Sequence, residues 1–223
     1  MGKREKIFIT WIILALVVLM YVTNLFKGSF PLFTIVWLCL PLIVVLCTKD
    51  AAMVGFKLIP LKEFFKVTLI NFCLSVSIIG IFEPWSHTYQ LLIKLATDST
   101  SPDVTFAWLI RYSGLASLIG MFLFSGFITM FGEELFFRGW LLQYLKSKMN
   151  NVWAIILQAA FFVLPNIIAA LFMPITQGII YTVVYAWVAI GIVGGWSANR
   201  TNSIWPSLIS ANIINLIAVI LYY

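Results

Sequence analysis

The chain has 223 residues, of which 62% are hydrophobic and 10% charged, and its formal net charge is +6. A soluble domain is nearer half apolar and a quarter charged, so the composition predicts a polytopic all-α membrane protein and excludes a sizeable soluble domain. No basic patch with interleaved aromatic residues is found, so we expect no nucleic-acid partner and instead loop lysines that face anionic membrane lipids.

Seven apolar segments of roughly 20 residues are each long enough to cross a bilayer. In chain order they are residues 7–26, 30–47, 64–82, 112–132, 152–172, 178–196 and 204–223. A polar connector is expected at 49–62, and the longest polar loop, with the single histidine His87, at 83–103. The fourth helix is expected to continue through "EELFFRGWLLQYLKSK". Residues 1–112 form N-terminal helices and loops and 113–223 a core, within one integral membrane unit.

The distribution of lysine and arginine predicts the orientation of the chain, because cytoplasmic loops are rich in both. With the N-terminus in the cytoplasm, 11 of the 14 basic residues lie inside and only Lys27, Lys94 and Arg111 lie outside. The C-terminus is then outside. Cys39, Cys47 and Cys73 show no metal or disulfide spacing, so we expect three buried small side chains and no metal or cofactor.

The stretch "GEELFFRGW" at 132–140 carries three charges in an otherwise apolar run. An ionisable group at the centre of a membrane helix costs about 2.5–3.5 kcal/mol. Glu134 and Arg138 are four residues apart, which predicts an intrahelical ion pair. Glu133 is turned about 100° away, lacks a partner at helical spacing, and is therefore the candidate functional residue. Alternatively, all three charges mark the inner end of the helix among lipid headgroups.

Few polar residues at membrane depth could meet Glu133. The fifth segment offers Gln158 and Asn166, and Pro165 is expected to kink the helix there. The seventh offers Asn212 and Asn215. Such amides alternatively form ordinary interhelical hydrogen bonds of about 0.6 kcal/mol each. Smaller residues in these segments indicate packing or a shared face: Gly191 with Gly195, and Ser207 with Ala211 ahead of Asn215.

Three short motifs resemble those of the CAAX-protease and bacteriocin-processing family, also called CPBP or Abi. "EELFFR" is similar to its E-E-x-x-x-R signature and places Glu133, Glu134 and Arg138. "FFVLPN" lies where the family has F-x-x-x-H, with Asn166 at the histidine position. "ANIIN" lies where the family has H-x-x-x-N, with Ala211 at the histidine position and Asn215 at the asparagine. The resemblance runs from residue 113 to the C-terminus.

The resemblance implies a helical membrane protease that acts near the cytoplasmic leaflet, in bacteria often on peptides linked to bacteriocin immunity or signalling and in eukaryotes on prenylated CAAX proteins. The first glutamate and first histidine activate water, and the second histidine and the asparagine stabilise the oxyanion. The second glutamate and the arginine shape the site. Some bacterial members act as scaffolds. The resemblance therefore marks Glu133, Glu134, Arg138, Asn166 and Asn215 as the site.

Both family histidines are missing here, and His87 is predicted to lie on the outer side. Asparagine cannot shuttle a proton near pH 7 as histidine does, although it can orient water or donate to an oxyanion. Two interpretations follow. One is a degenerate protease that binds a peptide or membrane-protein partner, as an immunity or cell-envelope regulator. The other is an active endopeptidase that uses Glu133 with asparagine amides. A transporter-like or unrelated structural role is a third.

Overall fold

The computed structural model describes residues 43, 46, 54–97 and 130–222, and every regular element in these ranges is a helix. The elements are α3 (Leu61–Ser86), α4 (Thr88–Thr97), α6 (Phe131–Glu133), η4 (Glu134–Leu141), α7 (Leu142–Lys146), α8 (Asn151–Ala170), α9 (Ile175–Ile179), η5 (Ile180–Ile192), α10 (Val193–Thr201) and α11 (Trp205–Tyr222). The predicted third, fifth, sixth and seventh segments correspond to helices. The first two segments and most of the fourth lie outside the described residues.

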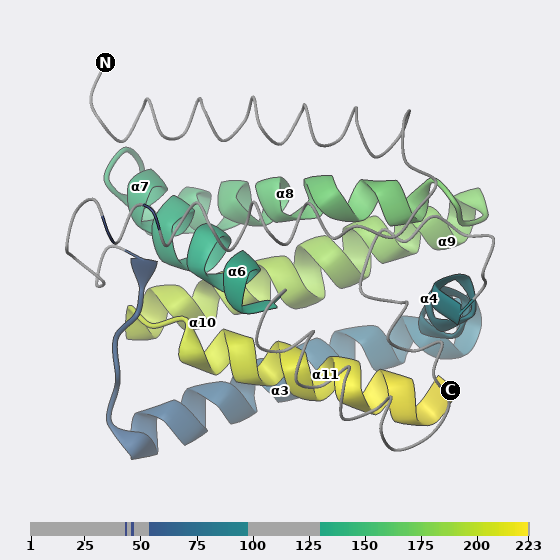
Figure 1. Cartoon of the computed structure of the whole chain (residues 1–223), viewed down its shortest axis with the longest axis horizontal. Coiled ribbons are helices and arrows are strands. Elements are labelled where there is room, and N and C mark those ends of the chain that lie inside the picture. The colour runs from purple at the N-terminus through teal and green to yellow at the C-terminus, as the bar shows by residue number, and fades with distance from the viewer. Residues whose placement is uncertain (1–42, 44–45, 47–53, 98–129, 223) are drawn as a thin grey trace.

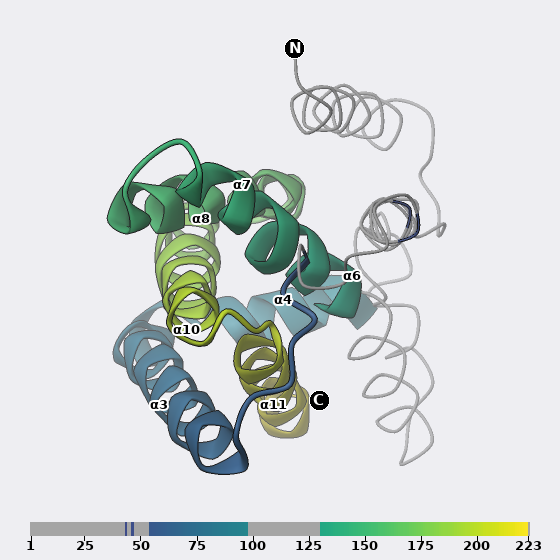
Figure 2. The same cartoon turned by 90° about the vertical axis from the view of Figure 1, so that its left-hand side faces the viewer.

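Several of these elements join end to end. Elements α6, η4 and α7 form one helix, and α9, η5 and α10 form another from Ile175 to Thr201. Helix α8 packs along η5, while α3 packs against both α11 and η5. Figure 1 shows α3 and α11 side by side below α8, and Figure 2 shows α10 between α8 and these two helices. The helix that carries the three charges therefore lies against the same bundle as α8 and α11.

The side chains of α3 are distributed as in a membrane helix. Its outward face is apolar, with Leu69 61% and Trp85 88% exposed, while Asn71, Ser75 and Glu83 are buried. Two helices, Leu61–Ser86 and Ile175–Thr201, are long and apolar enough to cross a membrane. An apolar outside around a polar inside is the pattern expected where lipid is the solvent.

Buried hydroxyl and amide groups tie α3 to its neighbours. Asn71 donates to Ser197 Oγ at 2.8 Å and accepts from Ser210 Oγ at 3.0 Å. Ser75 donates to the Ala189 carbonyl at 2.6 Å. Because a polar side chain that is buried without a partner is costly, this network fixes how α3, η5, α10 and α11 fit together.

The prediction of a polar loop at 83–103 was wrong for residues 83–97, which the structure describes and which are largely helical. Helix α3 runs to Ser86, and Thr88–Thr97 forms α4. The Glu83 carboxylate accepts the backbone N–H groups of Tyr89 at 2.9 Å and Gln90 at 3.3 Å, as well as the Tyr185 hydroxyl at 2.6 Å. A carboxylate that accepts the free N–H groups at a helix start favours the helix, which is why polar residues are helical here. His87 joins the two helices with φ 49°.

The cysteine expectation also needs correction. Cys73 is a free, exposed thiol on α3. The buried polar network lies on the opposite face of the same helix. Cys39 and Cys47 lie outside the described residues. Position on the helix face, and not residue type, decided the exposure of Cys73.

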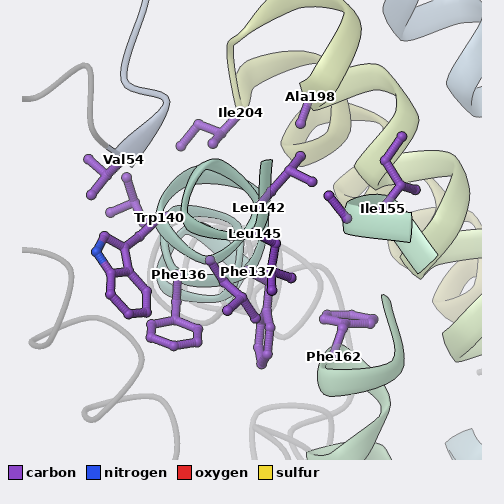
Figure 3. Packing of buried hydrophobic residues seen from close by; sticks show 13 residues of the cluster. Val54, Phe136, Phe137, Trp140, Leu142, Leu145, Ile155, Phe162, Ala198 and Ile204 are labelled. Atoms are coloured by element: carbon purple, nitrogen blue, oxygen red, sulfur yellow. The ribbon is translucent and has the colours of Figure 1, made fainter. Parts of the chain in front are cut away.

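The connector before α3 crosses the end of the charged helix. Residues 54–60 are non-helical, in agreement with the expected connector, although the helix begins at Leu61. A Cβ on Gly139 would come within 2.0 Å of the Val54 carbonyl oxygen, so only glycine permits this crossing. Figure 3 shows Val54 and Phe136 beside Trp140, and Phe137 facing Phe162 of α8. This apolar cluster anchors η4 in the bundle.

Candidate functional site

The charged helix continues as predicted from Phe131 to Lys146. Its middle, Glu134–Leu141, has π-helical hydrogen bonds, in which residue i pairs with i+5. This winding brings residues five apart closer to one face than in an α-helix. Arg138 acts electrostatically on the carboxylates of both Glu133 and Glu134. Among the described residues Glu133 nevertheless makes no ion pair, in line with the expectation that it has no partner at helical spacing.

The predicted ion pair is confirmed. Arg138 Nη1 lies 3.3 Å from Glu134 Oε1, and both side chains are almost completely buried. Ser207 Oγ donates to Glu134 Oε2, and Arg138 Nη2 donates to the Ile190 carbonyl at 2.9 Å. The pair joins η4 to η5 and α11 inside the protein. For these two residues, burial contradicts the alternative that they lie among lipid headgroups.

The guanidinium of Arg138 is also packed on both sides. Its Cζ lies 3.9 Å from the centre of the Phe162 ring, at a distance typical of a cation–π interaction. A Cβ on Gly194 would lie 3.2 Å from Arg138 Nε, so the glycine gives the guanidinium room. Figure 3 shows Phe162 pointing toward η4. We call Glu134, Arg138, Ser207 and Phe162 the ion-pair cluster.

Glu133 occupies a less enclosed position than Glu134. Its side chain is half-buried, and no hydrogen bond to it is found among the described residues. It interacts electrostatically with Arg138 and with the hydroxyl of Tyr181 on η5. Glu133 is thus a carboxylate close to several polar groups but outside the ion pair of Glu134 and Arg138.

Both polar groups of Asn166 are engaged. Its Nδ2 donates to the Phe162 carbonyl one turn earlier at 3.0 Å, and its Oδ1 accepts the Tyr181 hydroxyl at 2.6 Å. Tyr181 therefore lies in contact with Asn166 and under the influence of Glu133. We call Glu133, Asn166 and Tyr181 the Glu133 site.

The α11 residues of the third motif face the charged helix. Ser207 binds Glu134, and Asn215 Nδ2 lies 3.6 Å from Met130 Sδ, one turn before Glu133. Ala211 between them is buried and carries no polar group. Asn212, in contrast, donates to the Leu208 carbonyl of its own helix at 2.8 Å. Of the two α11 asparagines, Asn215 is thus the one directed toward the charged helix.

The other polar candidate, Gln158, packs against Gly195 of α10. Its side chain is fully buried, and its amide makes no hydrogen bond within the described part of the chain. A Cβ on Gly195 would come within 2.6 Å of Gln158 Oε1, and one on Gly191 within 2.9 Å of Ala159 Cβ. The predicted packing role of the two glycines is confirmed, since α8 and the η5–α10 helix touch through them.

Comparison with protein families gives one match. A family model described as "Type II CAAX prenyl endopeptidase Rce1-like" matches residues 115–217. This segment is close to the part of the chain that the three motifs indicated, and it contains the charged helix, Asn166 and Asn215. Over residues 115–217 the chain is therefore similar to the CAAX-protease (CPBP) family of helical membrane proteins. Searches of the curated proteins and of the solved structures gave no match.

Sequence reasoning missed two contributors to the site. Tyr181 lies in an apolar run where a tyrosine has no distinctive pattern, and only the fold shows that its hydroxyl meets Asn166. Ser207 was noticed for its spacing but not as the donor to Glu134. No group of three His, Cys, Asp or Glu side chains suited to a metal ion occurs in residues 54–97 and 130–222.

Proposed function

We propose that this protein is a catalytically degenerate member of the CAAX-protease family that binds a peptide or membrane-protein partner at the Glu133 site. The role would be that of a bacterial immunity or cell-envelope regulator. The observation that carries the proposal is the state of Asn166, because its donor is held by Phe162 and its acceptor by Tyr181. These two hydrogen bonds hold the amide within the bundle, and an amide, unlike a histidine, cannot shuttle a proton near pH 7.

The remaining side chains support the same conclusion. Ala211 provides no donor at the second histidine position. A tyrosine has an unperturbed pKa of about 10, so Tyr181 is a poor proton acceptor at neutral pH, where general bases work best with a pKa near 7. The ion-pair cluster that holds η4 in place is nevertheless complete. A site that keeps its scaffold but lacks a proton shuttle is suited to binding more than to hydrolysis.

The alternative is an active glutamate endopeptidase, which is favoured by the half-buried carboxylate of Glu133, one turn after the Met130 that Asn215 contacts. In that case Glu133 would act as the base and the Asn215 amide as the donor to the oxyanion. Asn215 makes only a long contact to a thioether sulfur, a weak acceptor, so its amide could change partner.

One experiment separates the two functions. The purified chain in lipid nanodiscs is mixed with a fluorescent farnesylated peptide that ends in a CAAX-type sequence. Fluorescence polarisation measures binding, and mass spectrometry measures cleavage. We expect binding that Glu133→Gln weakens, without cleavage. Glu133-dependent cleavage by the unmodified chain would establish the endopeptidase, and absence of binding would remove this peptide class as the ligand.

We also propose that the basic end of the bundle faces the cytoplasm. The start of α3, the end of α7 and the end of α10 lie together in Figure 1, and α4 lies at the opposite end. The first group of ends carries Lys62, Lys146 and Arg200, whereas α4 carries Lys94. Labelling of tags on intact cells would test this orientation, with a protected N-terminal tag and an accessible C-terminal tag expected.

A further inference from the structure

Exposed side chains of two opposite kinds alternate along the connector and the first turns of α3. Lys57, Lys62 and Lys66 are exposed, and none of them makes an ion pair with a described residue. Beside them lie Leu58, which is 84% exposed, and Phe65, which is 61% exposed. Exposed lysines suit water and exposed large apolar side chains suit lipid, so this stretch suits the boundary between the two.

The helical period of α3 sorts the two kinds of side chain into neighbouring rows. Lys62 and Lys66 are four residues apart and therefore share one side of the helix. Leu61, Phe65 and Leu69 repeat at the same spacing and form an exposed apolar row next to the lysines. A phospholipid beside this helix would meet the lysines with its headgroup and the apolar row with an acyl chain.

The charge of this part of the surface is not balanced among the described residues. Arg200, at the end of α10, has its Nε 3.7 Å from Glu63 Oε1 on α3. Together with Lys57, Lys62 and Lys66, they make four basic residues and one acidic residue, a net charge of +3. We call these five residues the basic corner. An excess of positive charge beside exposed apolar side chains is complementary to a lipid with a net negative charge.

The connector joins the basic corner to the charged helix. It crosses that helix at Gly139, where a side chain would have no room. Its Gly55 carbonyl accepts the Ile204 N–H at 3.1 Å, and its Lys57 carbonyl accepts the Ser203 hydroxyl at 2.6 Å. Figure 1 shows the connector descending at the left-hand end of the molecule to the start of α3. A ligand that holds the basic corner in place would therefore also hold the connector on the charged helix.

We propose that the basic corner is a binding site for an anionic phospholipid, and that the bound lipid holds the connector on the charged helix. The headgroup accepts hydrogen bonds from the ammonium groups of Lys62 and Lys66, and an acyl chain lies along Phe65 and Leu69. The site is separate from the Glu133 site, and its occupation does not depend on the binding of a peptide.

Lys94 offers a matched control, because it is an exposed lysine on α4, at the opposite end of the bundle. The purified full chain is equilibrated in detergent micelles with equal amounts of phosphatidylglycerol and phosphatidylcholine. Native mass spectrometry then measures the ratio of the two lipids bound. The variants are Lys62→Gln, the charge-preserving Lys62→Arg, Lys94→Gln and the double variant Lys62→Gln with Lys66→Gln. All of these side chains are exposed, so the fold should be retained.

The unmodified chain should bind more phosphatidylglycerol than phosphatidylcholine. A lysine beside an anionic lipid is worth about a fivefold preference, so Lys62→Gln should lower the ratio about fivefold and the double variant should remove most of it. Lys62→Arg and Lys94→Gln should keep the ratio. In nanodiscs, the unmodified chain should melt at a higher temperature with phosphatidylglycerol than with phosphatidylcholine, and the double variant should lose this difference.

Four results would overturn the inference. A lipid ratio near one in the unmodified chain would refute selection of an anionic lipid. Equal losses in Lys62→Gln and Lys94→Gln would show a general effect of charge without a site. Displacement of the lipid by an equal concentration of soluble glycerol phosphate would show that the acyl chain contributes nothing. A double variant that keeps the difference in melting temperature would refute the effect of the lipid on the connector.

Discussion

The ion-pair cluster and the Glu133 site are adjacent in the chain but differ in how they are enclosed. Glu134 and Arg138 are buried and hold each other, with Ser207 and the Ile190 carbonyl as further partners. Glu133 is half-buried and has electrostatic neighbours, but no hydrogen bond to it is found among the described residues. Two consecutive glutamates of one motif therefore differ, since Glu134 belongs to a buried ion pair and Glu133 does not.

This difference predicts that the two parts of the motif tolerate substitution differently. Breaking the ion-pair cluster leaves a buried charge, which is costly. A change at Glu133 breaks no ion pair or hydrogen bond found among the described residues, so the bundle should tolerate it.

The largest effect is expected from Glu134→Ala. It leaves Arg138 buried without its carboxylate, at a cost of about 3–5 kcal/mol. Folded yield and melting temperature should fall sharply, whereas Glu133→Ala should cost much less. The double variant Glu134→Leu with Arg138→Met should recover much of the loss, since a buried pair is often replaceable by apolar groups. Similar melting temperatures for Glu133→Ala and Glu134→Ala would contradict the proposed difference between the ion-pair cluster and the Glu133 site.

The second prediction restores the missing chemistry. Asn166→His provides an imidazole that can accept and return a proton, and Ala211→His returns an oxyanion donor, which is worth about 10²–10³ in rate. Either change alone should give little activity, because members of a catalytic unit act together. The pair should cleave peptide, and Glu133→Gln should abolish the cleavage.

The size-matched control for this experiment is Asn166→Gln with Ala211→Gln, which adds bulk without an imidazole and should stay inactive. Because Ala211 is buried, each variant is first checked for its melting temperature. A folded double-histidine variant that remains inert would mean that the ligand-binding region itself has diverged from that of a protease.

Ser207→Ala should have an intermediate effect. It removes the hydroxyl that donates to Glu134, and a hydrogen bond to a charged group is worth about 1.5–3 kcal/mol. The melting temperature should fall, while peptide binding at the Glu133 site should change little. If Ser207→Ala lost peptide binding but kept its melting temperature, Ser207 would belong to the Glu133 site and not to the ion-pair cluster.

Much of this architecture could be predicted from the sequence, and the exceptions have physical causes. Hydropathy located α3, α8 and α11, because apolar length is what a membrane requires. The four-residue spacing of Glu134 and Arg138 predicted their ion pair. The sequence did not indicate α4, because the start of this helix is stabilised by the carboxylate of Glu83 in the preceding helix, which accepts the Tyr89 N–H. It did not indicate Tyr181, because the partner of a hydroxyl is set by how two distant helices pack.

The smallest effect is expected where α8 meets η5, since this contact aligns Asn166 with Tyr181. A Cβ on Gly191 would lie 2.9 Å from Ala159 Cβ, so Gly191→Ala should push the helices apart at a cost of about 1–3 kcal/mol. Gly80 on α3 has open space around it, so Gly80→Ala should be neutral or gain up to about 1 kcal/mol of helix propensity. Melting temperatures measure both changes.

If the Glu133 site depends on this alignment, Gly191→Ala should also weaken peptide binding, and Gly80→Ala should not. Gly191→Ala should also slightly disturb the ion-pair cluster, because the Ile190 carbonyl, which accepts a hydrogen bond from Arg138, is next to Gly191. A Gly191→Ala variant with lowered stability but unchanged peptide binding would show that the Glu133 site is positioned by the charged helix alone and that the α8 contact serves only packing.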